Sequence, residues 1–145
     1  SCAVCHRWSE DELRGRVEGI QTKVSEAMLQ AEEALVHAHF DIAAAVQAGT
    51  ADDDLRAARA LVRGAQFRWD YVSATNGMGF HSPQESMRLL GEAANLAQQA
   101  RVDAARLLAR HGVTSAPRYP DVSTRQKAWD VAQSFVGGAG VKLLP

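Results

Sequence analysis

The feature that most constrains the fold of this 145-residue chain is a hydrophobic repeat of helical spacing. Apolar side chains recur at steps of three and four over roughly forty residues, which places them on one face of a single α-helix. The repeat consists of Leu13, Val17, Ile20, Val24, Ala27, Ala31, Leu35, Ala38, Ile42 and Ala45. A helix of this length exceeds the globular average, so it needs comparably long partners, either in the same chain or in a dimer.

Both ends of this helix carry recognisable signals. Ser9 precedes three acidic residues and is the expected N-cap, with Glu12 in position to complete a capping box. The pattern persists to Ala48, and Gly49 suits the position just beyond the C-terminal cap. Small residues dominate the middle of the helix and permit close approach of another helix. We expect this alanine-lined face, which consists of Ala27, Ala31, Ala34 and Ala38, to mediate self-association.

A second helix is expected to begin at Thr50, before the acidic run 52–54, and to continue through Val72. The turn between the two helices is very short, so they should form an antiparallel hairpin. The buried face of the second helix is predicted to consist of Leu55, Ala58, Leu61, Val62, Ala65, Trp69 and Val72.

A break at residues 76–83, with two glycines and a proline, separates the hairpin from a third long helix. Ser82 is the expected cap of this helix, Pro83 its first residue and Glu85 the capping-box acid. The helix is expected to stop at residues 111–112. Its apolar positions are Met87, Leu90, Ala94, Ala97, Ala100, Ala104, Leu107 and Leu108.

After an extended connector at residues 116–120, Ser123 and Thr124 are candidate caps for a short fourth helix that runs to Phe135. No segment shows the two-residue alternation of a strand. The predicted fold class is therefore all-α, with a hairpin of two long helices and a third of comparable length. Residues 9–136 form this bundle and dimerisation region, and the glycine-rich residues 137–145 form a loose tail.

Residues 1–8 form a separate segment that opens with Cys2-Ala3-Val4-Cys5-His6. A Cys-x-x-Cys-His run is the attachment signature of c-type haem, in which both thiols form thioethers and the histidine is an axial iron ligand. The chain has no further cysteine to complete a four-thiolate zinc site. No strand precedes the motif, which disfavours a thioredoxin-like site. A disulfide between Cys2 and Cys5, with an incidental histidine, remains the alternative.

The other four histidines have different predicted roles. His81 lies in the glycine-rich break, where a neutral imidazole could be the distal ligand of a haem other than that on Cys5, although an ordinary polar role is the alternative. His37 and His39 are two positions apart on a helix, so they cannot chelate one metal and are expected to pack or form hydrogen bonds. His111 suits the negative end of the third helix.

Three aromatic residues, Phe67, Trp69 and Tyr71, cover more than one face of the second helix, so some are expected to contact a cofactor, a partner helix or a dimer mate. Packing in the core is the default for each. Arg68 and Asp70 are most simply a solvated ion pair, although Arg68 would also suit a haem propionate.

Composition narrows the possible functions. The net charge of −1 gives no electrostatic case for binding nucleic acid. No apolar run reaches the length of a membrane span, and no signal peptide is present. Covalent haem attachment implies an exported protein, so we expect a mature or truncated chain. Because the chain opens on the haem motif, it is expected to be the later part of something larger.

Several stretches resemble, in order, the C-terminal part of the pentahaem, ammonia-forming cytochrome c nitrite reductases, and they cover nearly the whole chain. They are the Cys-Ala-Val-Cys-His opening and residues 35–40, 65–70, 79–85, 107–112 and 120–124. The resemblance implies that Cys2, Cys5 and His6 hold the last haem of the enzyme. It also implies that His81 is a distal ligand to a neighbouring haem, and that the long helices form a homodimer interface.

The same resemblance implies a periplasmic enzyme that reduces nitrite to ammonium with six electrons and receives them from a cytochrome or quinol dehydrogenase. The family's catalytic haem, its lysine ligand and its distal pocket belong to upstream sequence, as do the further haems. No catalytic residue is therefore expected here, and the chain alone should not reduce nitrite. Calcium is possible in the full enzyme, but no site for it is visible. The alternatives are a free-standing mono-haem electron-transfer bundle and a haem-free helical interaction module.

Overall fold

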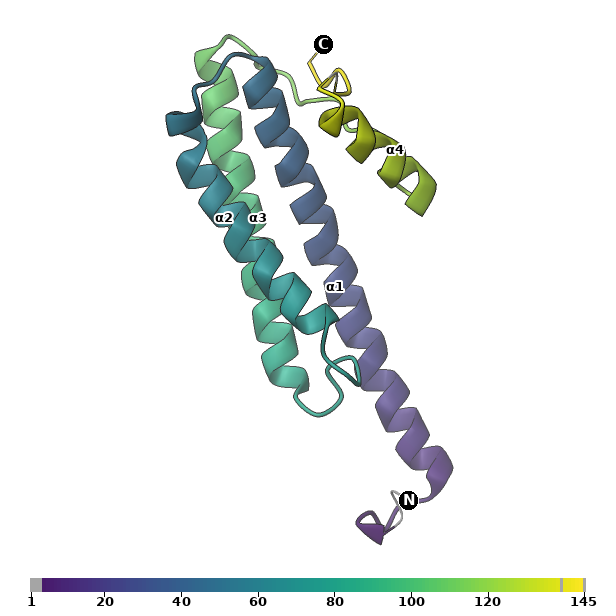
Figure 1. Ribbon diagram of the computed structural model, residues 1–145. Coiled ribbons are helices and arrows are strands. Elements are labelled where there is room, and N and C mark those ends of the chain that lie inside the picture. The colour runs from purple at the N-terminus through teal and green to yellow at the C-terminus, as the bar shows by residue number, and fades with distance from the viewer. Residues whose placement is uncertain (1–3, 139, 145) are drawn as a thin grey trace.

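The computed structural model describes residues 4–138 and 140–144, and over these residues it contains four α-helices and no strand (Figure 1). They are α1 (Glu10–Gln47), α2 (Asp52–Ser73), α3 (Pro83–Arg110) and α4 (Arg125–Val136). The expected all-α fold, with a hairpin followed by a third long helix, is confirmed.

The first three helices form a bundle in which α3 packs extensively along both α1 and α2, while α1 and α2 touch each other less. The longest helix, α1, extends well beyond the other two towards its N-terminus (Figure 1). The large side chains that are fully buried are Val24, Leu55, Val72, Leu90 and Leu143. The part of α1 that precedes Val24 has no fully buried residue.

Packing inside the bundle corrects the prediction for the alanine-lined face of α1. Ala31 and Ala38 have no exposed surface, and Ala34 is 6% exposed. Small side chains let helices approach closely, and here the helices that approach belong to the same chain. This face is therefore part of the intramolecular core, and the expectation that it mediates self-association is wrong.

The N-terminus of α1 is capped as predicted, but the capping box is only half formed. The Glu12 amide donates a hydrogen bond to Ser9 Oγ at 3.2 Å. The Glu12 carboxylate does not complete the box, because its Oε1 accepts a hydrogen bond from Arg16 Nη2 at 3.0 Å.

At its other end, α1 terminates in a Schellman motif. Gly49 has φ +92°, and its amide donates to the carbonyl of Val46 at 3.0 Å, while the Thr50 amide donates to the carbonyl of Ala45 at 3.0 Å. Thr50 therefore belongs to the C-terminal capping motif of α1 and does not begin α2. The N-cap of α2 is Ala51, which has no side chain able to cap.

The break between α2 and α3 is a tight loop seated on α1. Gly79 has φ +74°, and a Cβ there would lie 2.9 Å from both Ser86 Oγ and Val24 Cγ2, so only glycine fits. Because Ser86 faces this loop, it is buried, and Met87, which was predicted to be buried, is 44% exposed. Ser82 stands at the N-cap of α3 as expected, but its side chain forms no capping hydrogen bond.

The C-terminal residues are anchored, which contradicts the expected loose tail in its described part. Gln47 Nε2 donates to the carbonyl of Val141 at 2.7 Å, and the Leu143 amide donates to Gln47 Oε1 at 3.0 Å. The Arg118 amide donates to the carbonyl of Leu143 at 2.8 Å, and the Leu143 side chain is fully buried. These hydrogen bonds hold Val141 and Leu143 against the end of α1 and the connector after α3.

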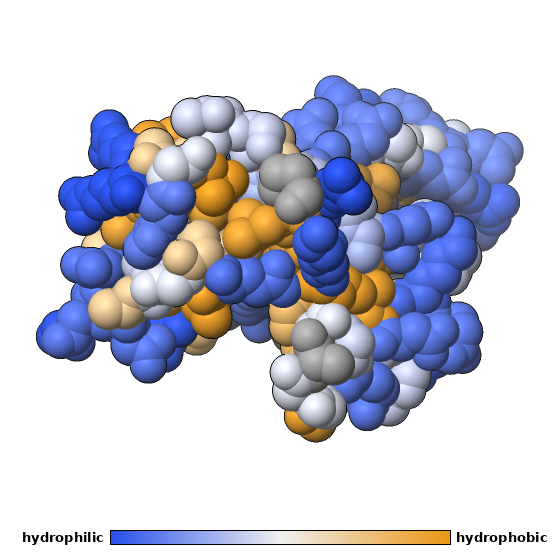
Figure 2. Space-filling model, turned by 90° about the horizontal axis from the view of Figure 1, so that it is seen from above, coloured by the Kyte–Doolittle hydropathy of each residue, from blue (hydrophilic) through white to orange (hydrophobic). Residues whose placement is uncertain are grey.

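The short helix α4 is capped by Thr124, as predicted, and lies beside α1 without contributing a buried residue (Figure 1). Seen from the end where the C-terminus lies, hydrophobic side chains reach the surface between hydrophilic ones (Figure 2). Among the described residues, no helix is both long enough and apolar enough to cross a membrane.

Candidate haem-attachment site

Cys5 and His6 lie in a short turned segment directly before α1, and both side chains are exposed. Cys5 forms no disulfide with any residue that the structure describes, and Cys2 lies outside the described residues. The segment is at the end of α1 that projects beyond α2 and α3 (Figure 1). The exposed Cys5 thiol and the adjacent His6 imidazole are two of the three side chains that the attachment motif uses, so the residues described here fit this cofactor.

A stack of side chains, which the sequence reasoning missed, connects His6 to α1. The His6 ring stacks on the Trp8 ring with centroids 5.6 Å apart and planes at 28°. The guanidinium carbon of Arg16 lies 4.4 Å from the centre of the Trp8 ring. The available signals were Trp8 directly before the helix cap and the i,i+4 spacing of Glu12 and Arg16.

His81 is exposed on the loop between α2 and α3, and its ring meets that of Phe80 edge-on, with centroids 5.0 Å apart. Gln21 Nε2 donates to the carbonyl of Gly77 at 3.1 Å, which holds the loop against α1. Gln21 is eleven residues along α1 from Glu10, a rise of roughly 16 Å. The structure therefore does not bring His81 and His6 together.

His37 takes part in a network that fixes the connector after α3. Its ring stacks on Tyr119 with centroids 4.2 Å apart. The Tyr119 hydroxyl donates to Asp41 Oδ1 at 2.7 Å, and Arg101 Nε donates to Asp41 Oδ2 at 3.0 Å. Asp41 is 5% exposed, and burial together with this hydrogen bond raises the pKa of Tyr119. The expected packing role of His37 agrees with this contact, but the sequence did not reveal the network.

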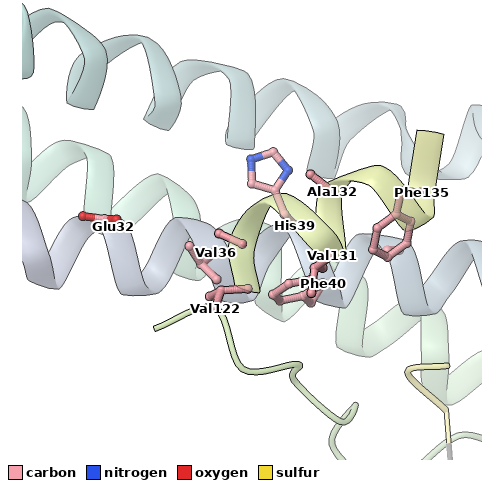
Figure 3. Close-up of a pocket in the computed structure, with 10 residues that line it drawn as sticks. Glu32, Val36, His39, Phe40, Val122, Val131, Ala132 and Phe135 are labelled. Carbon is pink, nitrogen blue, oxygen red and sulfur yellow. The ribbon is translucent and has the colours of Figure 1, made fainter. Parts of the chain in front are cut away.

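His39 borders the groove between α1 and α4, which has a volume of about 430 Å³ (Figure 3). Its side chain is exposed, yet the atoms around it remove enough water to lower its pKa, an effect that hydrogen bonding to Gln66 opposes. The groove walls are mainly apolar, with Glu32 at one end along α1. The other lining residues are Val36, Phe40, Ala43, Val122, Ala128, Val131, Ala132 and Phe135.

The aromatic residues of α2 divide between core and surface. The Trp69 indole donates to the carbonyl of Met28 at 3.1 Å and packs against the core. Phe67 and Tyr71 are 69% and 57% exposed. Of these three aromatic residues, Trp69 packs in the core as expected, and Phe67 and Tyr71 do not.

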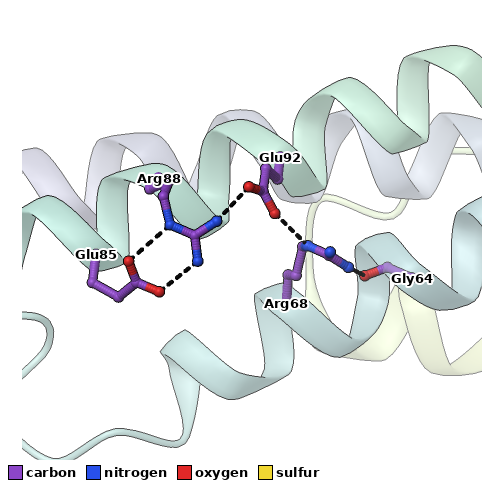
Figure 4. Close-up of polar contacts among 5 residues, drawn as sticks. All are labelled: Gly64, Arg68, Glu85, Arg88 and Glu92. Atoms are coloured by element: carbon purple, nitrogen blue, oxygen red, sulfur yellow. Dashed lines mark hydrogen bonds and ion pairs between the residues drawn. The ribbon is translucent and has the colours of Figure 1, made fainter.

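Arg68 does not pair with Asp70, because side chains two positions apart on a helix point in different directions. Its Nε instead donates to Glu92 Oε2 on α3 at 2.8 Å, and its Nη1 donates to the carbonyl of Gly64 at 2.9 Å (Figure 4). Arg88 pairs with Glu92 and Glu85 and continues the chain of charges along α3. Hydrogen bonds from these arginines lower the pKa values of both glutamates. Arg68 therefore connects α2 to α3 through its ion pair with Glu92.

Across the described residues, no group of three or more His, Cys, Asp or Glu side chains is placed to hold a metal ion. Cys5 and His6 are adjacent, exposed residues with donor atoms that a covalently attached haem would use.

A helical bundle with Cys5 and His6 at its projecting end has the features of a c-type cytochrome. The chain belongs to the cytochrome c552 family, whose sequence model matches residues 1–137. It is 41% identical over 137 residues to cytochrome c-552 of Porphyromonas gingivalis and 40% identical to cytochrome c-552 of Bacteroides fragilis. Each match covers 94% of this chain and 27% of the relative, so the chain spans about a quarter of the curated relatives it matches. Membership of a cytochrome c family implies haem c as cofactor.

Proposed function

We propose that this chain is the C-terminal haem-binding, electron-transfer and dimerisation portion of a periplasmic, ammonia-forming cytochrome c nitrite reductase. The observation that carries the proposal is the Cys-x-x-Cys-His motif, whose Cys5 and His6 lie before the projecting end of α1, within a cytochrome c552 match that covers residues 1–137. The partial coverage of the relatives supports the view that such an enzyme has much more sequence than this chain. Reduction of nitrite would depend on that further sequence, with a cytochrome or quinol dehydrogenase as electron donor.

Cys2 and Cys5 would hold the haem covalently, and His6 would be an axial ligand to its iron. A haem c in this position supplies one-electron transfer between ferric and ferrous iron. The chain's own contribution is to attach the cofactor at an accessible helix end, where a second redox centre can approach it (Figure 1).

His81 is proposed as the distal ligand of a haem carried by other sequence of the longer protein. Its exposure and its position on a loop well along α1 from His6 support this assignment. In the longer protein, His81→Ala should convert one low-spin haem to a high-spin or water-ligated one without loss of covalent haem. In the 145-residue chain, the same change should leave the haem spectrum unaltered. Conversion of the Cys5 haem itself to high spin would favour the self-contained mono-haem cytochrome.

Homodimerisation through α1 is also proposed, but through the face opposite the alanine-lined one. On this outer face, Leu29 is 62% exposed and Val46 is 47% exposed. Steps of three and four connect these two residues through Glu32, Val36, His39 and Ala43, the spacing of a helix-pairing seam. These four residues also line the groove beside α4, so the partner helix is proposed to enter that groove.

This interface can be tested by sedimentation. Leu29→Glu should dissociate the dimer, because it places a charge in an apolar contact, while circular dichroism should remain helical. Ala57→Glu, at an exposed position of α2, is the matched control and should remain dimeric. An unchanged dimer in the Leu29 variant would place the interface elsewhere.

The proposed function as a whole is tested by the intact mass and haem count of the natural protein from its source cells. A pentahaem enzyme predicts a much longer polypeptide with five covalent haems. A polypeptide of this length with one haem would support the mono-haem alternative. A polypeptide without haem would support the helical interaction module.

A further inference from the structure

The contacts of Trp8 point to a role at the haem site beyond attachment. One face of the indole stacks on the His6 imidazole, with centroids 5.6 Å apart, and Arg16 lies over the same ring system at 4.4 Å. Glu12 Oε1 accepts a hydrogen bond from Arg16 at 3.0 Å, and Ser9 caps the helix turn that carries Glu12. His6 is therefore connected by side-chain contacts to the first two turns of α1.

Two effects could follow from this stack, namely orientation of the His6 ring and the electrostatic field of Arg16. The Arg16 and Glu12 side chains are 54% and 46% exposed and form an ion pair, so water and the opposite charge screen the field. Stacking, in contrast, restricts the planes of both rings, and the cation over the indole holds it in place. Orientation is therefore the larger effect.

We propose that Trp8 is a positioning residue that sets the ring plane of the axial ligand His6, with Arg16 holding the indole in place. This inference rests on the proposed attachment of haem at Cys2 and Cys5. A residue in this role acts through His6, so replacing Trp8 should alter the orientation of the ligand and not the number of haems attached.

The test uses the 145-residue chain carrying covalent haem, in its ferric cyanide form. Cyanide is axially symmetric, so the spread of the four haem methyl proton resonances reports the plane of the histidine ligand. Trp8→Ala should shift these resonances and change their spread. Trp8→Phe should restore most of the wild-type pattern because a phenyl ring can stack. Trp129→Ala, at a tryptophan that is 61% exposed on α4, is the matched control and should leave the pattern unchanged.

An identical methyl pattern in Trp8→Ala and wild type, at equal haem content, would overturn the proposal. Should Trp8→Ala take up no haem while its helical circular dichroism is intact, uptake by Trp8→Phe would support positioning, and failure of both variants would contradict it. A wild-type chain without covalent haem would instead refute the proposed function. The stack itself can then still be tested in the haem-free chain, where Trp8→Ala should abolish the ring-current shift of the His6 protons.

Discussion

At the scale of single residues, the structure distinguishes buried polar groups that have partners from one that does not. Asp41 is buried, but its two carboxylate oxygens accept hydrogen bonds from Tyr119 and Arg101. Thr50 is 8% exposed, and among the described residues its Oγ1 is the buried side-chain oxygen without a hydrogen-bond partner. Burying a polar group costs free energy unless a hydrogen bond replaces its water.

Thr50→Val should therefore leave the free energy of unfolding unchanged or raise it by up to about 1 kcal/mol, since a methyl group replaces an unpaired hydroxyl. Urea unfolding followed by circular dichroism measures this. The control is Thr75→Val, which removes a hydroxyl that donates to the carbonyl of Val72 at 2.7 Å and should cost about 1 kcal/mol. A loss of stability in Thr50→Val as large as that of the control would reveal a hydrogen bond for Thr50.

Tyr119→Phe should lower the free energy of unfolding by about 1–3 kcal/mol at pH 7, because it removes a hydrogen bond to the buried carboxylate of Asp41. Burial raises the pKa of Tyr119 above its ordinary value, so its contribution is fully present below about pH 10 and is lost as the pH rises through the raised pKa. Tyr119→Phe has no hydroxyl to ionise, so its free energy of unfolding should fall less steeply than that of the wild type as the pH rises above about 10. The exposed Tyr71→Phe is the control, and equal alkaline slopes in Tyr119→Phe and wild type would contradict the account.

At the scale of helices, sequence reasoning succeeded where the signals are local. The cap at Ser9, the glycine after α1 and the proline at the start of α3 are signals read within a few residues of a helix end, and the structure agrees with them. The choice of which α1 face is covered depends on α3, which packs against it from far along the chain. Periodicity identified the apolar face correctly but could not show that the same chain covers it.

Ala31→Leu tests how tightly these helices pack. Ala31 has no exposed surface, so added methyl groups should lower the free energy of unfolding by about 1–3 kcal/mol through strain and displaced backbone. Ala57→Leu, on the exposed side of α2, should change it by less than about 0.5 kcal/mol. Equal effects of the two substitutions in thermal unfolding would indicate that the bundle around Ala31 is loose.

At the scale of the whole molecule, His6 and His81, the two histidines proposed as haem ligands, lie at separate places relative to α1. His6 precedes the N-terminal end of α1, and the loop that carries His81 is held against α1 by the hydrogen bond from Gln21 to the carbonyl of Gly77. The Cys-x-x-Cys-His motif that contains His6 can be recognised in the sequence, because haem attachment uses residues that are close together along the chain. The stack of Trp8 with Arg16 and the anchoring of Val141 and Leu143 by Gln47 depend on side chains meeting in space, which spacing alone does not show.

The measurement that tests the central claim most directly is acid-acetone extraction of the purified chain, followed by a pyridine haemochrome spectrum of the protein fraction. Covalent attachment at Cys2 and Cys5 predicts that the haem stays with the wild-type protein at one per chain. Replacement of both cysteines by alanine should release it, while circular dichroism remains helical. A wild-type chain whose haem passes entirely into the acetone, or that binds none when expressed with haem-attachment machinery, would contradict the account.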